Sequence, residues 1–245
     1  DEAFAYEIDA KKVEPLQVEN GLAIIALVGD QMKNHTGISG RLFSALGKNG
    51  VNIRAISQGS SERNISAVLN KADINKAINV IHEAFFEIEY KEINLFIAGT
   101  GNVGKKLLAQ IALQQEFLKE KLRLKLKVAG IAKSKQFLID EHGIDLNNWE
   151  SLIEQGPHET IHSFAKKIKE MNLRNSVFAD ITASEEVATV YHSLLEKSIS
   201  VVACNKIACS SAFEVYKKLK QTAREFNTYF LFETNVGASL PVIIT

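Results

Sequence analysis

The run NLFIAGTGNVGKKLL, residues 94 to 108, limits the possible folds of this chain more than any other stretch. The apolar segment 93 to 99 is typical of a strand buried on both faces of a parallel sheet, and apolar residues recur at helical spacing after residue 102. Between the two, glycines follow in GxGxxG order. The stretch therefore predicts a strand, a tight turn and a helix, in the order of a dinucleotide-binding unit.

Each glycine of this run has a physical role. Gly99 and Gly101 let the chain turn tightly and approach a pyrophosphate, and Gly104 lets the helix pack close to the strand. The free amides near Asn102 and Val103, at the helix N-terminus, would face the phosphates. A dinucleotide site is the favoured interpretation, and a purely structural glycine turn is the alternative.

The rest of the second half alternates between strand and helix patterns. Strands are expected at 124 to 132, 176 to 182, 199 to 205 and 228 to 234, with helices near 160 to 171, 185 to 197 and 211 to 226. This alternation predicts an α/β domain with a doubly wound, Rossmann-type parallel sheet. Ligands of such sheets bind beyond the carboxyl ends of the strands. We assign Trp149, which lies outside the motifs, to packing alone.

The residues after the second strand of this domain bear on the choice of nucleotide. An acidic residue there would hydrogen-bond the ribose hydroxyls of NAD, but this chain has Ala132, Lys133 and Ser134. The lysine and serine suit a 2′-phosphate, which favours NADP or dual use of NADP and NAD. The alternative is that Lys133 is an ordinary surface lysine.

The first half has a different pattern. A strand at 22 to 29 precedes an amphipathic helix at 36 to 50, strands at 51 to 57 and 64 to 70, and a helix at 71 to 86. This order predicts a ferredoxin-like sheet with helices on one face and an edge strand supplied nearby. The segment 3 to 9, AFAYEID, also reads as a strand.

Some polar groups of the first half could bind a small ligand. The helix that starts at Gly37 and Ile38 offers free amides to a carboxylate, and the side chains of Asn52 and Gln58 could complete an amino-acid site. These amide groups could equally satisfy turns of the backbone. His35 and His82 have no carboxylate or cysteine partners at useful spacing, so neither is expected to be a ligand.

Composition narrows the class of partner. The 29 lysines and arginines balance 29 aspartates and glutamates, so no overall field attracts nucleic acid or an anionic membrane. No apolar run approaches the roughly 20 residues that span a bilayer. Two cysteines are too few for a disulfide framework, which favours a reduced, cytoplasmic protein. We therefore expect small-molecule chemistry in the cytoplasm.

Several motifs together resemble the bifunctional aspartokinase/homoserine dehydrogenases of threonine and methionine biosynthesis. The resemblance covers residues 15 to 243 and rests on segments that recur there in this order: ALVGDQM, GISGRLFSAL, VNIRAISQGSSERNISAVL, FIAGTGNVGKKLLAQI, NKIACSS and FLFETNVGASLPVI. It implies that residues 1–17 are the tail of a preceding ACT domain. Residues 18–92 would be an ACT regulatory domain, and 93–245 the NAD(P)-binding domain of homoserine dehydrogenase, truncated before the catalytic domain.

The resemblance also implies an activity and a set of site residues. Homoserine dehydrogenases reduce aspartate semialdehyde to homoserine with NAD(P)H. Thr182 and Ser184 match the loop beside the nicotinamide ribose, and Lys206 matches a lysine near the nicotinamide. The loop in which the family binds a monovalent cation, sodium, is matched by Glu233, Val236, Ala238 and Leu240. The family's catalytic aspartate and lysine are expected after Thr245, so the chain by itself should have no turnover.

For the first half, the resemblance implies threonine as the effector, with Gln58 at the effector site. The helix start and the strand pair would lie at a contact between ACT domains, which implies a homo-oligomer. A second hypothesis is a stand-alone amino-acid sensor whose nucleotide-binding domain performs no catalysis.

Overall fold

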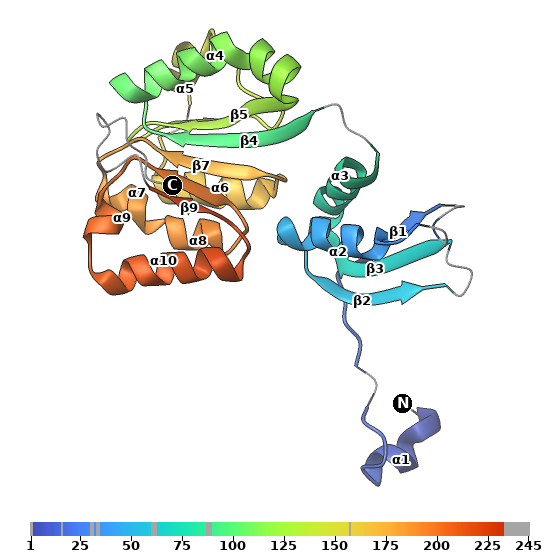
Figure 1. Cartoon of the computed structure of the whole chain (residues 1–245). Coiled ribbons are helices and arrows are strands. Elements are labelled where there is room, and N and C mark those ends of the chain that lie inside the picture. The colour runs from blue at the N-terminus through green and yellow to red at the C-terminus, as the bar shows by residue number, and fades with distance from the viewer. Residues whose placement is uncertain are drawn as a thin grey trace.

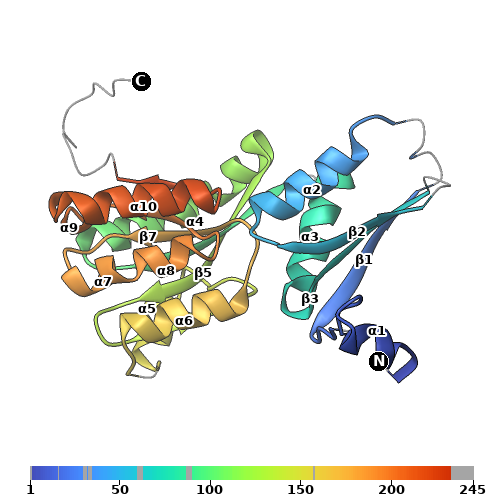
Figure 2. The ribbon, with the colours of Figure 1, turned by 90° about the horizontal axis from the view of Figure 1, so that it is seen from below.

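The computed structural model describes residues 2–15, 17–29, 32, 35–59, 63–86, 90–156 and 158–232. Two sheets organise these residues, one of three strands and one of six. In Figures 1 and 2 the two sheets and their helices form separate domains that lie side by side. This is the two-part α/β architecture expected from the sequence.

The first domain follows the predicted order of elements. Its elements are β1 (Leu22–Val28), α2 (Ile38–Lys48), β2 (Ile53–Gln58), β3 (Asn64–Asn70), the short helix η3 (Lys71–Asp73) and α3 (Ile74–Phe85). The sheet is antiparallel with the order β1-β3-β2. In the described part of the chain no further strand extends this sheet, because β4 pairs with strands of the second domain. The expected edge strand is therefore not found there.

One face of the three-stranded sheet is buried under α2 and α3. Leu42 and Leu46 of α2 are fully buried, and they pack with Ile65 and Leu69 of β3 in the core of this domain. The apolar face predicted for the helix is thus confirmed. The other face of the sheet is open, and Ile24 on β1 is 71% exposed.

The N-terminal segment differs from the expectation. Residues 3 to 9 are helical, in η1 (Glu2–Phe4) and α1 (Ala5–Asp9), so the predicted strand is wrong. A short apolar run does not distinguish a helix from a strand by its periodicity. Phe4 and Tyr6 are exposed by 58% and 75%, so neither side chain is held in a core.

The second domain contains the predicted doubly wound sheet. Its strands are β4 (Lys91–Ala98), β5 (Leu124–Ala132), β6 (Phe137–Ile139), β7 (Ser176–Asp180), β8 (Ser200–Ala203) and β9 (Phe230–Leu231), in the order β6-β5-β4-β7-β8-β9. Five strands are parallel, and β6 returns antiparallel to β5. The strand order reverses at β4, next to β7, which is the switch point where such sheets bind ligands.

Helices cover both faces of this sheet. Leu95 and Ile97 of β4 pack with α4 (Asn102–Leu122) and α5 (Trp149–Glu154), whereas Phe96 faces the opposite core. That core is formed with α6 (Ile161–Met171), α7 (Glu185–Thr189), α8 (Tyr191–Leu195) and α10 (Phe213–Glu225). Trp149 is buried in packing contacts, as predicted. Among the described helices, none is both long and apolar enough to cross a membrane.

The first domain contacts the second domain at the amino ends of the second domain's parallel strands (Figure 1). The Lys76 ammonium on α3 donates to Asn172 Oδ1 at 3.0 Å, and Asn172 Nδ2 donates to Asp73 Oδ1 at 2.7 Å. Gly50, just after α2, approaches Ser198 so closely that a Cβ on Gly50 would collide with the serine side chain. The two domains therefore meet in specific polar and steric contacts.

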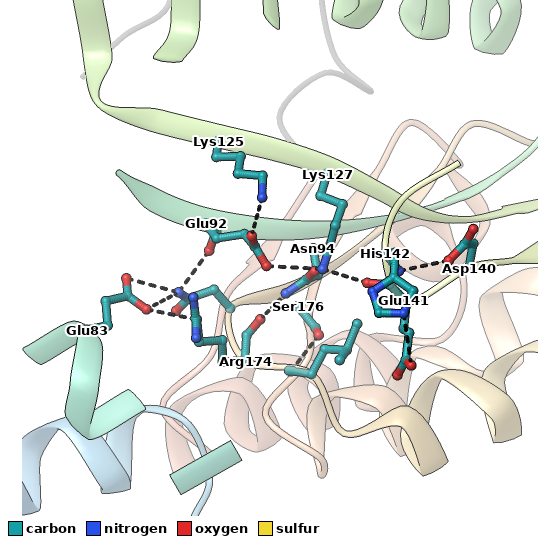
Figure 3. A network of polar contacts seen from close by, with 12 residues as sticks. Glu83, Glu92, Asn94, Lys125, Lys127, Asp140, Glu141, His142, Arg174 and Ser176 are labelled. Carbon is teal, nitrogen blue, oxygen red and sulfur yellow. Dashed lines mark hydrogen bonds and ion pairs between the residues drawn. The ribbon is translucent and has the colours of Figure 1, made fainter. Parts of the chain in front are cut away.

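Figure 3 shows a second group of polar contacts between the domains, which includes Glu83, Glu92 and Arg174. Asn175 Nδ2 donates to Glu83 Oε2 on α3 at 3.2 Å and to the Glu92 carbonyl at 3.0 Å. Arg174 Nε lies 3.1 Å from Glu83 Oε2, and Asn94 Nδ2 donates to the Arg174 carbonyl at 2.7 Å. The loop 172–175 between α6 and β7 is thus bound both to the first domain and to the start of β4.

Glu92 at the start of β4 is held by two lysines of β5. Its two carboxylate oxygens lie 3.1 Å from Lys125 Nζ and 3.1 Å from Lys127 Nζ (Figure 3). Burial by itself would raise the pKa of Glu92, but the hydrogen bonds and charges of the two lysines outweigh burial and hold the pKa below its usual value. The carboxylate therefore ties the beginnings of β4 and β5 together.

Candidate functional site

The glycine turn after β4 has the geometry that its sequence predicts. Gly99 has φ of +105°, and a Cβ there would lie 2.6 Å from the Ile181 carbonyl oxygen. A Cβ on Gly104 would overlap the Gly99 carbonyl oxygen, so helix α4 can pack this close to the turn only because residue 104 is glycine. The tight turn and the close helix packing are both confirmed.

Gly101 differs from its two neighbours in the motif. A Cβ added at Gly101 would meet no atom of the described chain within 4 Å. It directly precedes α4, whose first residues, Asn102 and Val103, are exposed, Val103 by 63%. The first amides of a helix of 21 residues lack partners within the helix and favour an anion. The turn thus leaves open space at the N-terminus of α4, beside its free amides.

The open turn lies at the switch point between β4 and β7. The Ile181 amide donates to the Ala98 carbonyl at 2.8 Å, and the Gly99 amide donates to the Ala132 carbonyl at 2.9 Å. Thr182 is close enough that its Cγ2 would lie 2.9 Å from a Cβ on Gly99. The structure therefore brings together the glycine turn, the end of β5 and the loop after β7, which are three of the predicted parts of the site.

Lys133 and Ser134 lie in the turn between β5 and β6. The Lys133 amide donates to the Gln136 carbonyl at 2.7 Å, and Ser134 is exposed. The Lys133 ammonium is 3.7 Å from a carboxylate oxygen of Glu154 on α5, whose side chain is 71% exposed. The end of β5 therefore carries a positively charged side chain, and the Glu154 carboxylate already lies close to it.

A buried carboxylate that the sequence analysis did not single out organises the other side of the site. Asp180, the last residue of β7, is completely buried. Its Oδ1 accepts from the Thr182 amide at 2.8 Å, and its Oδ2 accepts from the Tyr191 hydroxyl at 2.5 Å and from Asn205 Nδ2 at 3.0 Å. An acidic residue that ends an otherwise apolar strand, SVFAD, was the available signal.

The Tyr191 hydroxyl that donates to Asp180 stays protonated. Burial, together with the adjacent charge of Asp180, raises the pKa of Tyr191. The phenol therefore remains protonated and acts as a donor to the carboxylate across the pH range in which the protein can be studied.

Lys206 lies beyond the end of β8, at the start of α9 (Ile207–Ser210). It is exposed, and it lines an open, mainly apolar cavity of about 550 Å³ together with Phe213, Tyr216 and Phe232. Ser184 lies in the loop after β7, and its amide donates to Thr182 Oγ1 at 3.2 Å. Lys206 and Ser184 therefore both lie at the carboxyl end of the parallel sheet, on the β8 side of the glycine turn.

The effector residues expected in the first domain fall at two ends of that domain. β1 and β2 are both antiparallel to β3, so Gln58, the last residue of β2, lies at the same end as Gly37 and Ile38 at the start of α2. Asn52 precedes β2 and lies about 20 Å from Gln58, because Gln58 is six positions further along the extended chain. The structure thus groups Gly37, Ile38 and Gln58 and separates Asn52 from them.

The loop that the resemblance assigns to a monovalent cation lies outside the described residues. Its four expected residues are Glu233, Val236, Ala238 and Leu240.

Comparison with known families agrees with both domains. Residues 25–85 match the family model of an ACT domain. Residues 99–233, more than half of the chain, match the model described as the NAD binding domain of homoserine dehydrogenase. The two matches leave residues 86 to 98 between them, which comprise the segment after α3 and the strand β4.

Individual relatives share this arrangement. A bifunctional aspartokinase/homoserine dehydrogenase of Haemophilus influenzae is 39% identical over 98% of this chain and 29% of its own length. A chloroplastic enzyme of the same name from Arabidopsis thaliana is 36% identical over 99% of this chain and 26% of its own length. The chain thus spans less than a third of either relative.

The solved structures add agreement on the fold. A Candida auris protein of unknown function matches 62% of this chain and 41% of its own, with a TM-score of 0.52 and 23% identity. The family model covers the glycine turn and all the described strands beyond it. This chain therefore belongs to the homoserine dehydrogenase NAD-binding family, and within it an ACT domain precedes the NAD-binding domain, as in the bifunctional aspartokinase/homoserine dehydrogenases.

Proposed function

We propose that this chain is the regulatory and cofactor-binding part of a bifunctional aspartokinase/homoserine dehydrogenase. Its second domain binds NADP(H) at the carboxyl ends of β4, β5, β7 and β8. In the complete enzyme, the bound NADPH supplies the hydride that reduces aspartate semialdehyde to homoserine. The ACT domain binds L-threonine as a feedback effector.

The open space at Gly101 carries this proposal. The three glycines lie in one motif, but only Gly101 leaves room for another atom. A dinucleotide needs that room because its pyrophosphate must approach the backbone at the start of α4. The match to the family model supports the same assignment from sequence.

A single added side chain tests the proposal. Gly101→Val should leave the fold unchanged, since a Cβ there meets nothing, but it should block the pyrophosphate and abolish NADPH binding in a fluorescence titration. Gly47→Val is the matched control, because Gly47 is also open but lies on α2 of the ACT domain. Undiminished NADPH binding by Gly101→Val, or no binding by the parent chain, would contradict the proposal.

The preference for NADPH is a finer part of the proposal. Lys133 would contact the 2′-phosphate, and Glu154 competes for it at 3.7 Å. Lys133→Ala should weaken NADPH binding severalfold and leave NADH binding unchanged, in line with the loss of one exposed charged contact worth about 1 kcal/mol. An equal loss for both nucleotides would show that Lys133 does not read the phosphate.

The threonine proposal rests on the group formed by Gly37, Ile38 and Gln58. The start of α2, a helix of 11 residues, offers amides to a carboxylate, and the Gln58 amide lies at the same end of the domain. Calorimetry should show L-threonine binding that Gln58→Ala removes and Asn52→Ala retains. A loss caused by Asn52→Ala instead would place the effector at the opposite end of the domain.

Three further parts of the proposal rest on the resemblance alone. They are a sodium ion held by carbonyl oxygens between residues 233 and 240, self-association through ACT domains, and a cytoplasmic location. Sedimentation of the chain at increasing concentration tests self-association, and a monomer at all concentrations would argue against it. Thermal unfolding in sodium chloride and in choline chloride tests the sodium site, and the same midpoint in both salts would argue against it.

A further inference from the structure

We propose that Asp180 is a positioning residue for the nicotinamide side of the cofactor site. Its one buried carboxylate holds the loop after β7 and the loop after β8 in a fixed relation, and thereby sets the places of Thr182, Ser184 and Lys206. The inference rests on the proposed function, because it assigns Asp180 to the site that function requires.

The carboxylate closes the loop after β7 from both ends. Thr182 donates its amide to Oδ1 at the beginning of the loop, and Tyr191 donates its hydroxyl to Oδ2 nine residues later, where α8 begins. Ser184 lies between these two anchors, and its amide donates to Thr182 Oγ1 at 3.2 Å. The loop beside the glycine turn is thus pinned to β7 at two points.

The same carboxylate reaches the loop after β8 through Asn205. Asn205 Nδ2 donates to Asp180 Oδ2 at 3.0 Å and to the Ser184 carbonyl at 2.8 Å. Asn205 Oδ1 accepts from the Ile207 amide at 3.1 Å, which fixes the turn that presents Lys206. Asn205 is itself 1% exposed, so this bridge between the loops is buried.

The position of Asp180 in the sheet shows why it acts indirectly. In the parallel register Asp180 pairs with Ala98 of β4 and with Ala203 of β8, so it ends the strand next to the glycine turn. The side chain is 0% exposed, whereas Thr182 and Ser184 are half-buried and Lys206 is exposed. Asp180 therefore does not touch a bound nucleotide, but the residues that it holds face the open edge.

Only a carboxylate fits this arrangement of donors. Three donors converge on two oxygens, and an ionised carboxyl group accepts on both. In Asp180→Asn one oxygen becomes an NH2 group, so that at least one of the three donors faces another donor whichever way the amide turns. When one member of a buried, charged hydrogen-bond cluster is removed, the groups that it bonded remain buried without a partner, which lowers the stability of the fold.

The test compares two ligands of the chain. NADPH spans both sides of the site, whereas adenosine 2′,5′-bisphosphate carries only the adenine half. Asp180→Asn should raise the dissociation constant for NADPH about tenfold, the effect of losing one hydrogen bond to a charged group. The constant for adenosine 2′,5′-bisphosphate should remain within about twofold of the parent value, because its contacts lie on the glycine-turn side of the site.

Two other variants secure the comparison. Asn205→Ala removes the bridge to Ser184 but leaves the Asp180 carboxylate with Thr182 and Tyr191, and it should show the same split between the two ligands. It carries the test if Asp180→Asn fails to fold. Ser176→Ala is the control, since Ser176 is also buried on β7 but at the amino end, where its hydroxyl donates to the Leu173 carbonyl at 2.7 Å.

The outcomes separate this inference from the proposed function. Equal loss of both ligands in Asp180→Asn and Asn205→Ala would mean that the cluster only stabilises the domain, and unchanged NADPH binding would mean that it positions nothing. Either result overturns the inference while the parent chain still binds NADPH. Absence of NADPH binding in the parent would overturn the proposed function and this inference together.

Discussion

The two ends of the parallel sheet carry similar polar residues but use them differently. At the amino end, Asn94 donates to the Arg174 carbonyl, Asn175 donates to the Glu92 carbonyl of β4, and Arg174 pairs with Glu83 on α3 of the ACT domain. At the carboxyl end, Asp180 and Asn205 are 0% and 1% exposed, and the loop after β7 lies beside Gly99 of the glycine turn, in which Gly101 faces open space. One end of the sheet therefore joins the two domains, and the other end leaves space for a ligand.

The largest effect is expected from closing the glycine turn itself. Gly104→Ala would place a methyl group against the Gly99 carbonyl oxygen. Because this oxygen belongs to the backbone, it cannot easily move away, and the free energy of unfolding should fall by about 3 kcal/mol. Chemical denaturation measures this change. A variant as stable as the parent would show that α4 does not pack against the turn as closely as the structure has it.

A smaller effect at the opposite end depends on pH. Burial lowers the pKa of Lys76 from 10.5 to about 8, the charge of Asp73 partly opposes this, and that of Lys197 adds to it. Between these pKa values the unfolded chain holds the proton and the folded chain does not, so stability rises with pH. Between pH 7.5 and 9.5 the free energy of unfolding of the parent should therefore rise by about 2 kcal/mol relative to that of Lys76→Met.

Parallel stability curves for the parent and Lys76→Met would contradict this account of the domain contact. The variant keeps the apolar stem of the side chain, so the difference between the curves isolates the charge buried beside Asn172.

The smallest effect is expected from loosening the domain contact without straining the chain. Asn175 has φ of +46°, so Asn175→Gly keeps the backbone conformation while it removes the hydrogen bonds to Glu83 and to the Glu92 carbonyl. The cost should be about 1 kcal/mol. NADPH affinity should not change, because the carboxyl end is untouched, and a weakened affinity in titration would mean that the two ends are coupled.

Much of the fold could be predicted from local pattern. The strand expected at 124 to 132 is observed with those bounds, because its second half, from Val128 to Ala132, is an uninterrupted run of apolar residues and glycine that is buried on both faces. The helix expected at 185 to 197 is divided at Val190 into α7 and α8. The strand expected at 3 to 9 is wrong because the alternating alanines and aromatics there suit a short exposed helix equally well.

The site could be predicted only where the residues are close in sequence. The glycine turn is a local motif, and its steric roles at Gly99 and Gly104 follow from spacing alone. Asp180, Tyr191 and Asn205 lie on β7, on α8 and after β8, and they meet only in the folded chain. Their spacing in the sequence therefore does not predict the cluster. The contact of Asn172 with Lys76 joins residues 96 positions apart, and it escapes pattern analysis for the same reason.

Amide hydrogen exchange with and without NADPH tests the difference between the two ends most directly. Binding at the carboxyl end should slow exchange at residues 99–104, 181–184 and 204–207, and it should leave 172–175 unchanged at the amino end. Protection confined to 172–175, or none at 99–104 in a chain saturated with NADPH, would contradict the assignment of the cofactor to the open edge of the sheet.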